Sequence, residues 1–165
     1  MTARDKYLIK IKKIADRRDP YVWGGQGQLL RRTPIYKIAE MEKNQKDYLR
    51  VCNYIHSRVS LGADMRDCRI WDCSGLVTYL LMKLHVIGGD TTAQGIYNMY
   101  TRHISLDSIS PGDLVFKGAD VNNITHVATY IGNNKIVEAK GRDDGVCYSL
   151  FVKSQWIAAG DPFDC

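Results

Sequence analysis

The chain has 165 residues and a mass of 18.7 kDa, with 45% hydrophobic residues, 25% charged residues, 14 glycines and 4 prolines. This composition excludes a collagen-like or disordered chain, and a chain of this length buries a core without disulfides, so we expect one domain over residues 1–165. No apolar run approaches the roughly 20 residues that a membrane-spanning helix needs. The N-terminal segment has no continuous apolar core and no small-residue cleavage site, so we expect no secretory signal peptide.

The net charge of +5 is distributed unevenly along the chain. Residues 1–18 carry seven basic and two acidic groups, and residues 31–69 carry nine and five, whereas residues 70–165 carry seven and ten. A basic half favours an anionic macromolecule as partner, either nucleic acid or the polymers of a bacterial envelope. A solvated helix face is the simpler explanation for any single lysine.

The five cysteines form an odd set without a C-x-x-C pair. This pattern argues against a disulfide framework and against a zinc site. We therefore expect no metal and no cofactor. Four cysteines are interpreted as reduced structural thiols: Cys52, Cys68, Cys147 and Cys165.

The N-terminal segment predicts an amphipathic helix over about residues 4–18, because its apolar residues recur at helical spacing. Those residues are Tyr7, Leu8, Ile11, Ile14 and Ala15. Asp19 and Pro20 end the helix, and a glycine-rich loop, "YVWGGQGQ", follows at residues 21–28.

Two more helices are expected in the basic segment. Thr33 and Pro34 resemble an N-cap followed by a first-turn proline, which opens a helix through about Glu42. A second helix covers about residues 46–59, and residues 60–68 form a loop. The expected inner face of the second helix consists of Tyr48, Leu49, Cys52 and Ile55.

A fourth helix is predicted from Cys73 to about His85, with "VIGGD" ending it. Its expected packing residues are Leu76, Val77, Leu80, Leu81 and Leu84. Thr91 or Thr92 caps a shorter helix that ends near Tyr100.

The period then changes to that of short β-strands separated by Gly, Asn and Asp. The predicted strands are residues 114–117, 126–132, 135–140, 146–151 and 155–160. Helices followed by an antiparallel sheet indicate an α+β fold.

Cys73 in "WDCSGLV" is a candidate nucleophile. A thiolate is the reactive species, and a helix N-terminus together with a nearby imidazole lowers the pKa of a thiol. The first-turn N–H groups would also face a developing oxyanion. A cysteine at a helix start is nevertheless common and usually inert, so partners must decide its role.

The partner base must be one of four histidines. His56 and His85 fall within or at the end of helices, and His103 falls in a connecting stretch. His126 begins a strand, and a nucleophile on a helix end paired with a histidine on a sheet is the arrangement of papain-like hydrolases.

Glu138 is the candidate for orienting the imidazole. If residues 132–134 ("GNN") form a three-residue hairpin loop, Ile131 lies opposite Lys135, and Ala128 lies opposite Glu138. Glu138 then shares a face with the proposed base and lies within reach of it. A two-residue loop would shift the register by one and turn Glu138 to the other face.

Four motifs occur in an order that resembles the NlpC-type bacterial cell-wall cysteine peptidases, over about residues 4–25 and 70–158. The motifs are "PYVWGG" (20–25), "WDCSGLV" (71–77), "SPGDLVF" (110–116) and "HVATYIGNNKIVEA" (126–139). The resemblance implies a papain-like core whose nucleophile-bearing helix packs on an antiparallel sheet. It also implies hydrolysis of amide bonds in peptidoglycan stem peptides, typically after γ-D-glutamate.

By position, the resemblance implies that Cys73 is the nucleophile and His126 the general base. Glu138 stands where the family often has a second histidine. A carboxylate there holds the imidazole tautomer and stabilises the imidazolium, so the substitution is chemically sound.

The resemblance also implies substrate-contacting residues. Tyr21 matches a tyrosine whose hydroxyl assists the oxyanion or the substrate, although it is equally interpreted as a core aromatic. Asp72 and Ser74 match positions that bind the free amine of the stem peptide and form the site wall, although Asp72 is also a plausible helix-start charge. Residues 26–69 form a basic helical insertion relative to simple members, either a lid, a selective wall or an extra packed layer.

Several alternatives stay open from the sequence. The same fold and thioester chemistry would serve an N-acetylmuramoyl-L-alanine amidase or an acyl transferase, and a catalytically silent relative would serve as a wall-binding or structural module. The expected partners are stem peptides and, through the basic helices, anionic wall polymers. We expect no nucleic-acid partner, because no nucleic-acid-binding motif is present. A phage or prophage lysin, a tail-associated wall hydrolase and a module of a secreted protein all fit a chain without a signal peptide.

Overall fold

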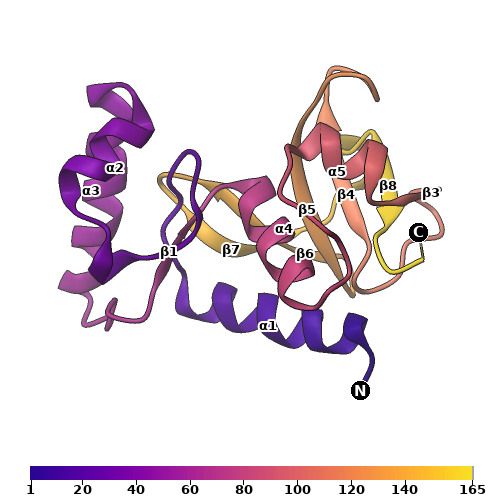
Figure 1. Cartoon of the computed structure of the whole chain (residues 1–165), viewed down its shortest axis with the longest axis horizontal. Helices are drawn as coiled ribbons and strands as arrows, with labels where there is room; N and C mark the ends of the chain where they lie inside the picture. The colour runs from indigo at the N-terminus through magenta and orange to yellow at the C-terminus, as the bar shows by residue number, and fades with distance from the viewer. Residues whose placement is uncertain (165) are drawn as a thin grey trace.

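The computed structural model describes residues 1–164, and the prediction made for Cys165 lies outside these residues (Figure 1). Six antiparallel strands form one sheet in the order β3-β8-β4-β5-β6-β7. Their bounds are β3 Arg102–Ile104, β4 Leu114–Gly118, β5 Ile124–Gly132, β6 Lys135–Gly141, β7 Gly145–Leu150 and β8 Ala158–Asp161. The predicted α+β class and all five predicted strands are confirmed, with β3 in addition.

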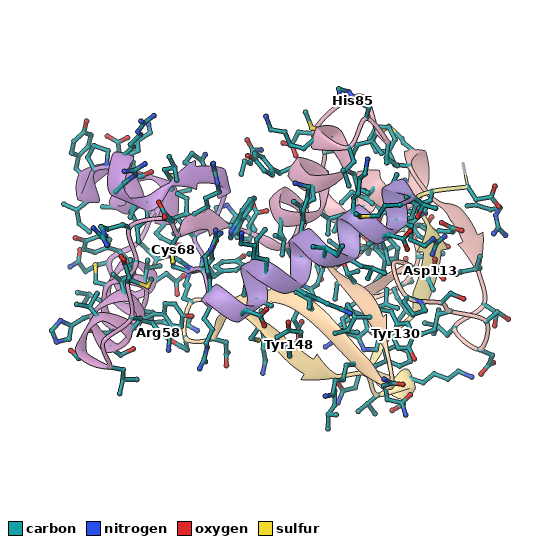
Figure 2. The ribbon with its side chains drawn as sticks, turned by 90° about the horizontal axis from the view of Figure 1, so that it is seen from below. Arg58, Cys68, His85, Asp113, Tyr130 and Tyr148 are labelled. Carbon is teal, nitrogen blue, oxygen red and sulfur yellow. The ribbon has the colours of Figure 1, made fainter. Side chains whose placement is uncertain are left out.

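Helix α1, Ala3–Arg17, runs along the sheet and α4 (Figures 1 and 2). Thr2 caps it in a reciprocal pair with Asp5, which satisfies the free N–H groups of the first turn. Its buried face includes Tyr7, whose hydroxyl lies 2.7 Å from the hydroxyl of Thr129 on β5. At the other end of α1, Tyr148 of β7 (labelled in Figure 2) donates a hydrogen bond of 2.7 Å to Asp16.

Helix α4, Cys73–Lys83, contributes the centre of the main core. It buries Leu76, Val77, Leu80 and Leu81 as predicted, against the side chains of α1 and the sheet. Helix α5, Ala93–Met99, follows, and Thr92 rather than Thr91 is its N-cap. No helix within residues 1–164 is both long and apolar enough to cross a membrane.

Helices α2, Ile35–Glu42, and α3, Gln45–Ser60, lie side by side at one end of the molecule, away from β3 and β8 (Figure 1). The capping prediction for Thr33 is wrong, because its hydroxyl donates to the carbonyl of Leu29 instead. The predicted inner face of α3 is right in part, because Tyr48 and Ile55 pack against the cluster that contains Val51. Leu49 is 47% exposed instead, and the buried residues of the helix, Val51 and Tyr54, were not predicted.

A second, two-stranded sheet lies between this helix pair and the main core, and the sequence did not predict it. Strands β1, Gln26–Leu29, and β2, Arg69–Trp71, pair in antiparallel fashion. The chain therefore leaves the main core at β1, forms the short 3-10 turn Leu30–Arg32 and the two helices, and returns at β2. Because β2 leads directly into α4, this returning strand positions the start of that helix.

The β5–β6 hairpin reaches the predicted pairing by a different turn. Gly132 lies opposite Lys135, so the loop has two residues, Asn133 and Asn134, both left-handed with φ of 52° and 54°. The expected pairing of Ile131 with Lys135 is wrong, because a bulge falls between Tyr130 and Gly132. Beyond the bulge, Tyr130 faces Ile136 and Thr129 faces Val137. Continued by one pair, this register sets Ala128 opposite Glu138, as expected.

Candidate active site

Cys73 is the first residue of α4, and the helix start is built around Asp72. The Asp72 side chain accepts hydrogen bonds from the N–H of Gly75 at 2.7 Å, from the hydroxyl of Ser74 at 3.3 Å and from the N–H of Gly24 at 3.0 Å. Burial raises the pKa of Asp72, and these hydrogen bonds oppose the rise. The structure therefore assigns Asp72 a capping role and links the helix start to the glycine-rich loop.

The glycine-rich loop and α4 are in close backbone contact. The N–H of Asp72 donates to the carbonyl of Gly25 at 2.8 Å. A Cβ added at Gly75 would overlap that same carbonyl oxygen, so only glycine fits there. The glycine after Ser74 is therefore needed for the glycine-rich loop to pack against the start of α4, and not only for a substrate to approach Cys73.

A buried carboxylate, Asp19, fixes the strand that leads to Cys73. Its oxygens accept from Trp71 Nε1 at 2.8 Å, from the N–H of Arg69 at 3.1 Å and from Arg17 at 2.6 Å. Asp19 is fully buried, and three donors compensate for the loss of water. This role was not predictable from the sequence, because Arg69 and Trp71 reach Asp19 only when the chain folds back, and Arg17 alone is a local partner.

His126 and Glu138 are in direct contact. His126 Nε2 lies 2.7 Å from Glu138 Oε2, with 20% and 6% of the two side chains exposed. Burial lowers the pKa of His126, but hydrogen bonding to Cys73 and Glu138, together with their charges, outweighs it and raises the pKa to about 9. The imidazole is therefore positioned between the thiol and the carboxylate and favours its charged form.

Three groups beside Glu138 support its ionised form. Burial would raise the pKa of Glu138, yet hydrogen bonds from His126 and Ser149 and the charge of Lys117 keep it below its usual value. Ser149 was not predicted. The polar alternation of Cys147 and Ser149 on a strand paired with that of Glu138 was the available signal, because alternate residues share one face.

The thiol of Cys73 is partly exposed and also faces the strand that carries the histidine. Its Sγ lies 3.9 Å from the carbonyl oxygen of Thr125. Tyr21, which forms a bridge with Trp71, is 8% exposed. Burial raises the pKa of its phenol, and the nearby charges of Cys73 and Asp72 raise it further, so the hydroxyl is a neutral donor. The structure thus places all six predicted site residues around one helix start.

Within residues 1–164, Cys147 lies opposite Glu138 on β7, whereas Cys68, His85 and His103 lie in other segments. Cys68 is buried beside the α2–α3 end of the molecule (Figure 2), and burial and the carboxylate of Asp19 raise its pKa to about 12. Burial also raises the pKa of Cys147. His85 follows the C-cap of α4 and lies at the upper edge of the molecule in Figure 2, and His103, expected in a connecting stretch, lies on β3.

The model of the NlpC/P60 family matches residues 18–160 of the chain. The chain belongs to the NlpC/P60 family. The match covers the glycine-rich loop, the helix that begins at Cys73 and the sheet that carries His126 and Glu138.

One curated relative of this NlpC/P60 domain is a probable peptidoglycan endopeptidase of Bacillus subtilis, LytE. The domain is 35% identical to LytE over 86 residues, an alignment that covers 52% of the chain and 24% of LytE. The chain thus spans about a quarter of the length of that curated relative.

Two solved structures share the fold of the NlpC/P60 domain over nearly its whole length. One is the P60 domain of an antigen of M. avium subspecies paratuberculosis, with a TM-score of 0.61, 21% identity and coverage of 99% and 100% of the two chains. The other is RipD of Mycobacterium tuberculosis, described as non-catalytic and adapted to peptidoglycan binding, with a TM-score of 0.62, 16% identity and coverage of 97% of each chain. These two likenesses show the fold alone, and because RipD is described as non-catalytic, the fold by itself does not indicate catalysis.

Proposed function

We propose that this chain is a peptidoglycan hydrolase, a cysteine endopeptidase that cleaves stem-peptide amide bonds after γ-D-glutamate. The observation that carries the proposal is His126, which interacts with the thiol of Cys73 and contacts Glu138 at 2.7 Å. Family membership and the similarity to LytE support peptidoglycan as the substrate. The proposal covers residues 1–165 as a single domain, with residues 26–69 as an insertion.

The reaction begins with the thiolate of Cys73 and the imidazolium of His126. The thiolate attacks the scissile carbonyl carbon, and the carbonyl oxygen becomes an oxyanion. The N–H groups of Gly75 and Leu76 are already bonded to Asp72, so the two N–H groups before them, those of Cys73 and Ser74, are the helix donors for this oxyanion. The phenol of Tyr21 is a third donor.

Collapse of the tetrahedral intermediate breaks the amide bond. The imidazolium gives its proton to the leaving nitrogen, and the acyl group remains on the sulfur as a thioester. Neutral His126 then takes a proton from water, whose oxygen attacks the thioester carbonyl carbon. The C–S bond breaks, the Cys73 thiolate leaves beside the imidazolium, and the carboxylic acid product loses its proton to solvent. Glu138 keeps the ring orientation through both steps.

Substrate binding is proposed for two further features. Asp72 and Ser74 lie beside the nucleophile and bind the stem amine, a role that Asp72 would combine with capping. The basic helices are proposed to contact anionic wall polymers, in a phage or prophage lysin, a tail-associated hydrolase or a module of a secreted protein.

The fold shared with RipD makes a non-catalytic wall-binding module the main competing function. Purified peptidoglycan is digested with the wild-type chain and with Cys73→Ala, and the released muropeptides are identified by mass spectrometry. We expect new termini after γ-D-glutamate with the wild-type chain and none with the variant, at equal thermal stability. Cleavage between muramic acid and L-alanine would identify an amidase, and wall binding without any product would identify a silent module.

A further inference from the structure

Glu42, the last residue of α2, places a fully buried carboxylate behind the glycine-rich loop. Its Oε1 accepts the backbone N–H of Trp23 at 2.9 Å, and its Oε2 accepts Nε of Arg142 at 2.7 Å. Both oxygens are thus used, one by the loop and one by the turn between β6 and β7. Three segments that are distant in sequence meet at this one side chain.

Arg142 extends the contact to the candidate active site. Its guanidinium carbon lies 5.3 Å from the centre of the Tyr21 ring, and 17% of its side chain is exposed. A guanidinium at this distance is attracted to the ring face and restricts its movement. The other side of the same segment is fixed by the N–H of Val22, which donates to the carbonyl of Trp71 at 2.9 Å. Tyr21 is therefore held between the strand leading to Cys73 and the Glu42–Arg142 pair.

A second, exposed ion pair also joins the helix pair to the β6–β7 turn. It shows how the two regions can be held together without burying a charge. Arg50 of α3 binds Asp143 of the β6–β7 turn at 2.6 Å, with side chains 38% and 63% exposed. Exposed pairs of this kind hold surfaces together at little cost, whereas a buried pair loses the hydration of both charges. Arg142 also lies 3.7 Å from Asp47 of α3 and so takes part in docking, but docking does not require a buried carboxylate that accepts the main-chain N–H of Trp23.

We propose that Glu42 and Arg142 are positioning residues of the active site, which hold Tyr21 and the main chain of Trp23 in the loop that contacts Asp72 at the start of α4. The proposal rests on the proposed peptidase function and assigns the inserted helix pair a part in catalysis. Residues 26–69 are then a built-in wall of the site and not an outer layer.

The test uses the full chain and variants chosen to keep it folded. The double change Glu42→Gln and Arg142→Met removes both charges, so that no uncompensated charge stays buried. Asp143→Ala is the matched control, because it breaks the exposed pair in the same turn without touching Tyr21 or Trp23. Each change is also made in a Tyr21→Phe background, and kcat and KM are measured on a stem peptide.

We expect the double variant to lose about 10- to 100-fold in kcat with little change in KM, since small misplacements of reacting groups have effects of this size. The loss should shrink to below about 2-fold in the Tyr21→Phe background, because coupled residues are not additive. Asp143→Ala should match the wild type. An equal loss with Asp143→Ala, an equal loss in the Tyr21→Phe background, or an unchanged kcat would overturn the proposal.

A second measurement is independent of hydrolysis. Amide hydrogen exchange at Trp23 is followed by NMR in the wild type, Glu42→Ala and Asp143→Ala. Faster exchange at Trp23 in Glu42→Ala alone supports the positioning contact, and unchanged exchange refutes it. If the wild-type chain hydrolyses no stem peptide, the proposed function fails and this measurement alone decides the positioning claim.

Discussion

Glu138→Gln isolates the charge that faces His126. The substitution keeps the shape of the side chain and removes a carboxylate 2.7 Å from Nε2 of the imidazole. Burial favours the neutral form of His126, and the carboxylate of Glu138 opposes this effect by stabilising the imidazolium. The substitution removes that stabilisation. A hydrogen bond to a charged group contributes roughly 1.5–3 kcal/mol, and one pKa unit corresponds to about 1.4 kcal/mol. The pKa of His126, about 9 in the wild type, should therefore fall by about 1–2 units.

The assay is an NMR titration of the histidine ring signals in both proteins. The chain has three other histidines, on α3, after α4 and on β3, and their signals serve as internal controls. The high-pH limb of kcat/KM should move down by the same amount, because His126 must be protonated to release the leaving amine. A His126 midpoint within about 0.3 units of the wild type would refute the claim that Glu138 holds the imidazolium.

Gly75→Ala should lower the free energy of unfolding by about 1–3 kcal/mol and reduce activity, because its new Cβ overlaps the Gly25 carbonyl. Gly88→Ala is the control in thermal unfolding, since a Cβ there meets nothing within 4 Å. The raised pKa of His126 also couples its charge to stability. That contribution, about 3 kcal/mol, is fully present below about pH 6.5 and lost as pH rises through about 9. Denaturant unfolding on both sides of this range should show a larger decline for the wild type than for Glu138→Gln, and equal declines would contradict the assignment.

The helices and strands of the core could be predicted because their signals are local. The spacing of Tyr7, Ile11 and Ile14 fixes the buried face of α1, and alternation fixes the strands. Local spacing was right only in part on α3: Tyr48 and Ile55 pack inward, but Leu49 is exposed while Val51 and Tyr54 are buried. The helix has apolar side chains on more than one face, so apolar character alone does not identify the inner one.

Strands β1 and β2 could not be predicted, because three or four residues carry no usable period and the pairing joins segments about 40 residues apart. The same applies to Asp19, Glu42 and Arg142. Each is an ordinary charged residue in the sequence, and its partners are set only by tertiary structure. The position of Cys73 was accessible because a helix start follows short-range rules. The facing of His126 and Glu138 was predicted through a three-residue loop that the hairpin does not have, and it holds because a bulge next to a two-residue turn gives the same register.

The bulge at Ile131 has a consequence for how the β5–β6 hairpin tolerates changes in length. With the present number of residues, a two-residue turn without a bulge would set Thr129 opposite Glu138 and point Glu138 away from His126, and the bulge restores the facing pair. The contact thus depends on the pairing of β5 with β6 beyond the bulge, and not on the number of residues between the two side chains. Deleting Ile131 would remove the bulge and keep Tyr130 opposite Ile136 and Gly132 opposite Lys135, so a hairpin shorter by this one residue would still turn Glu138 toward His126.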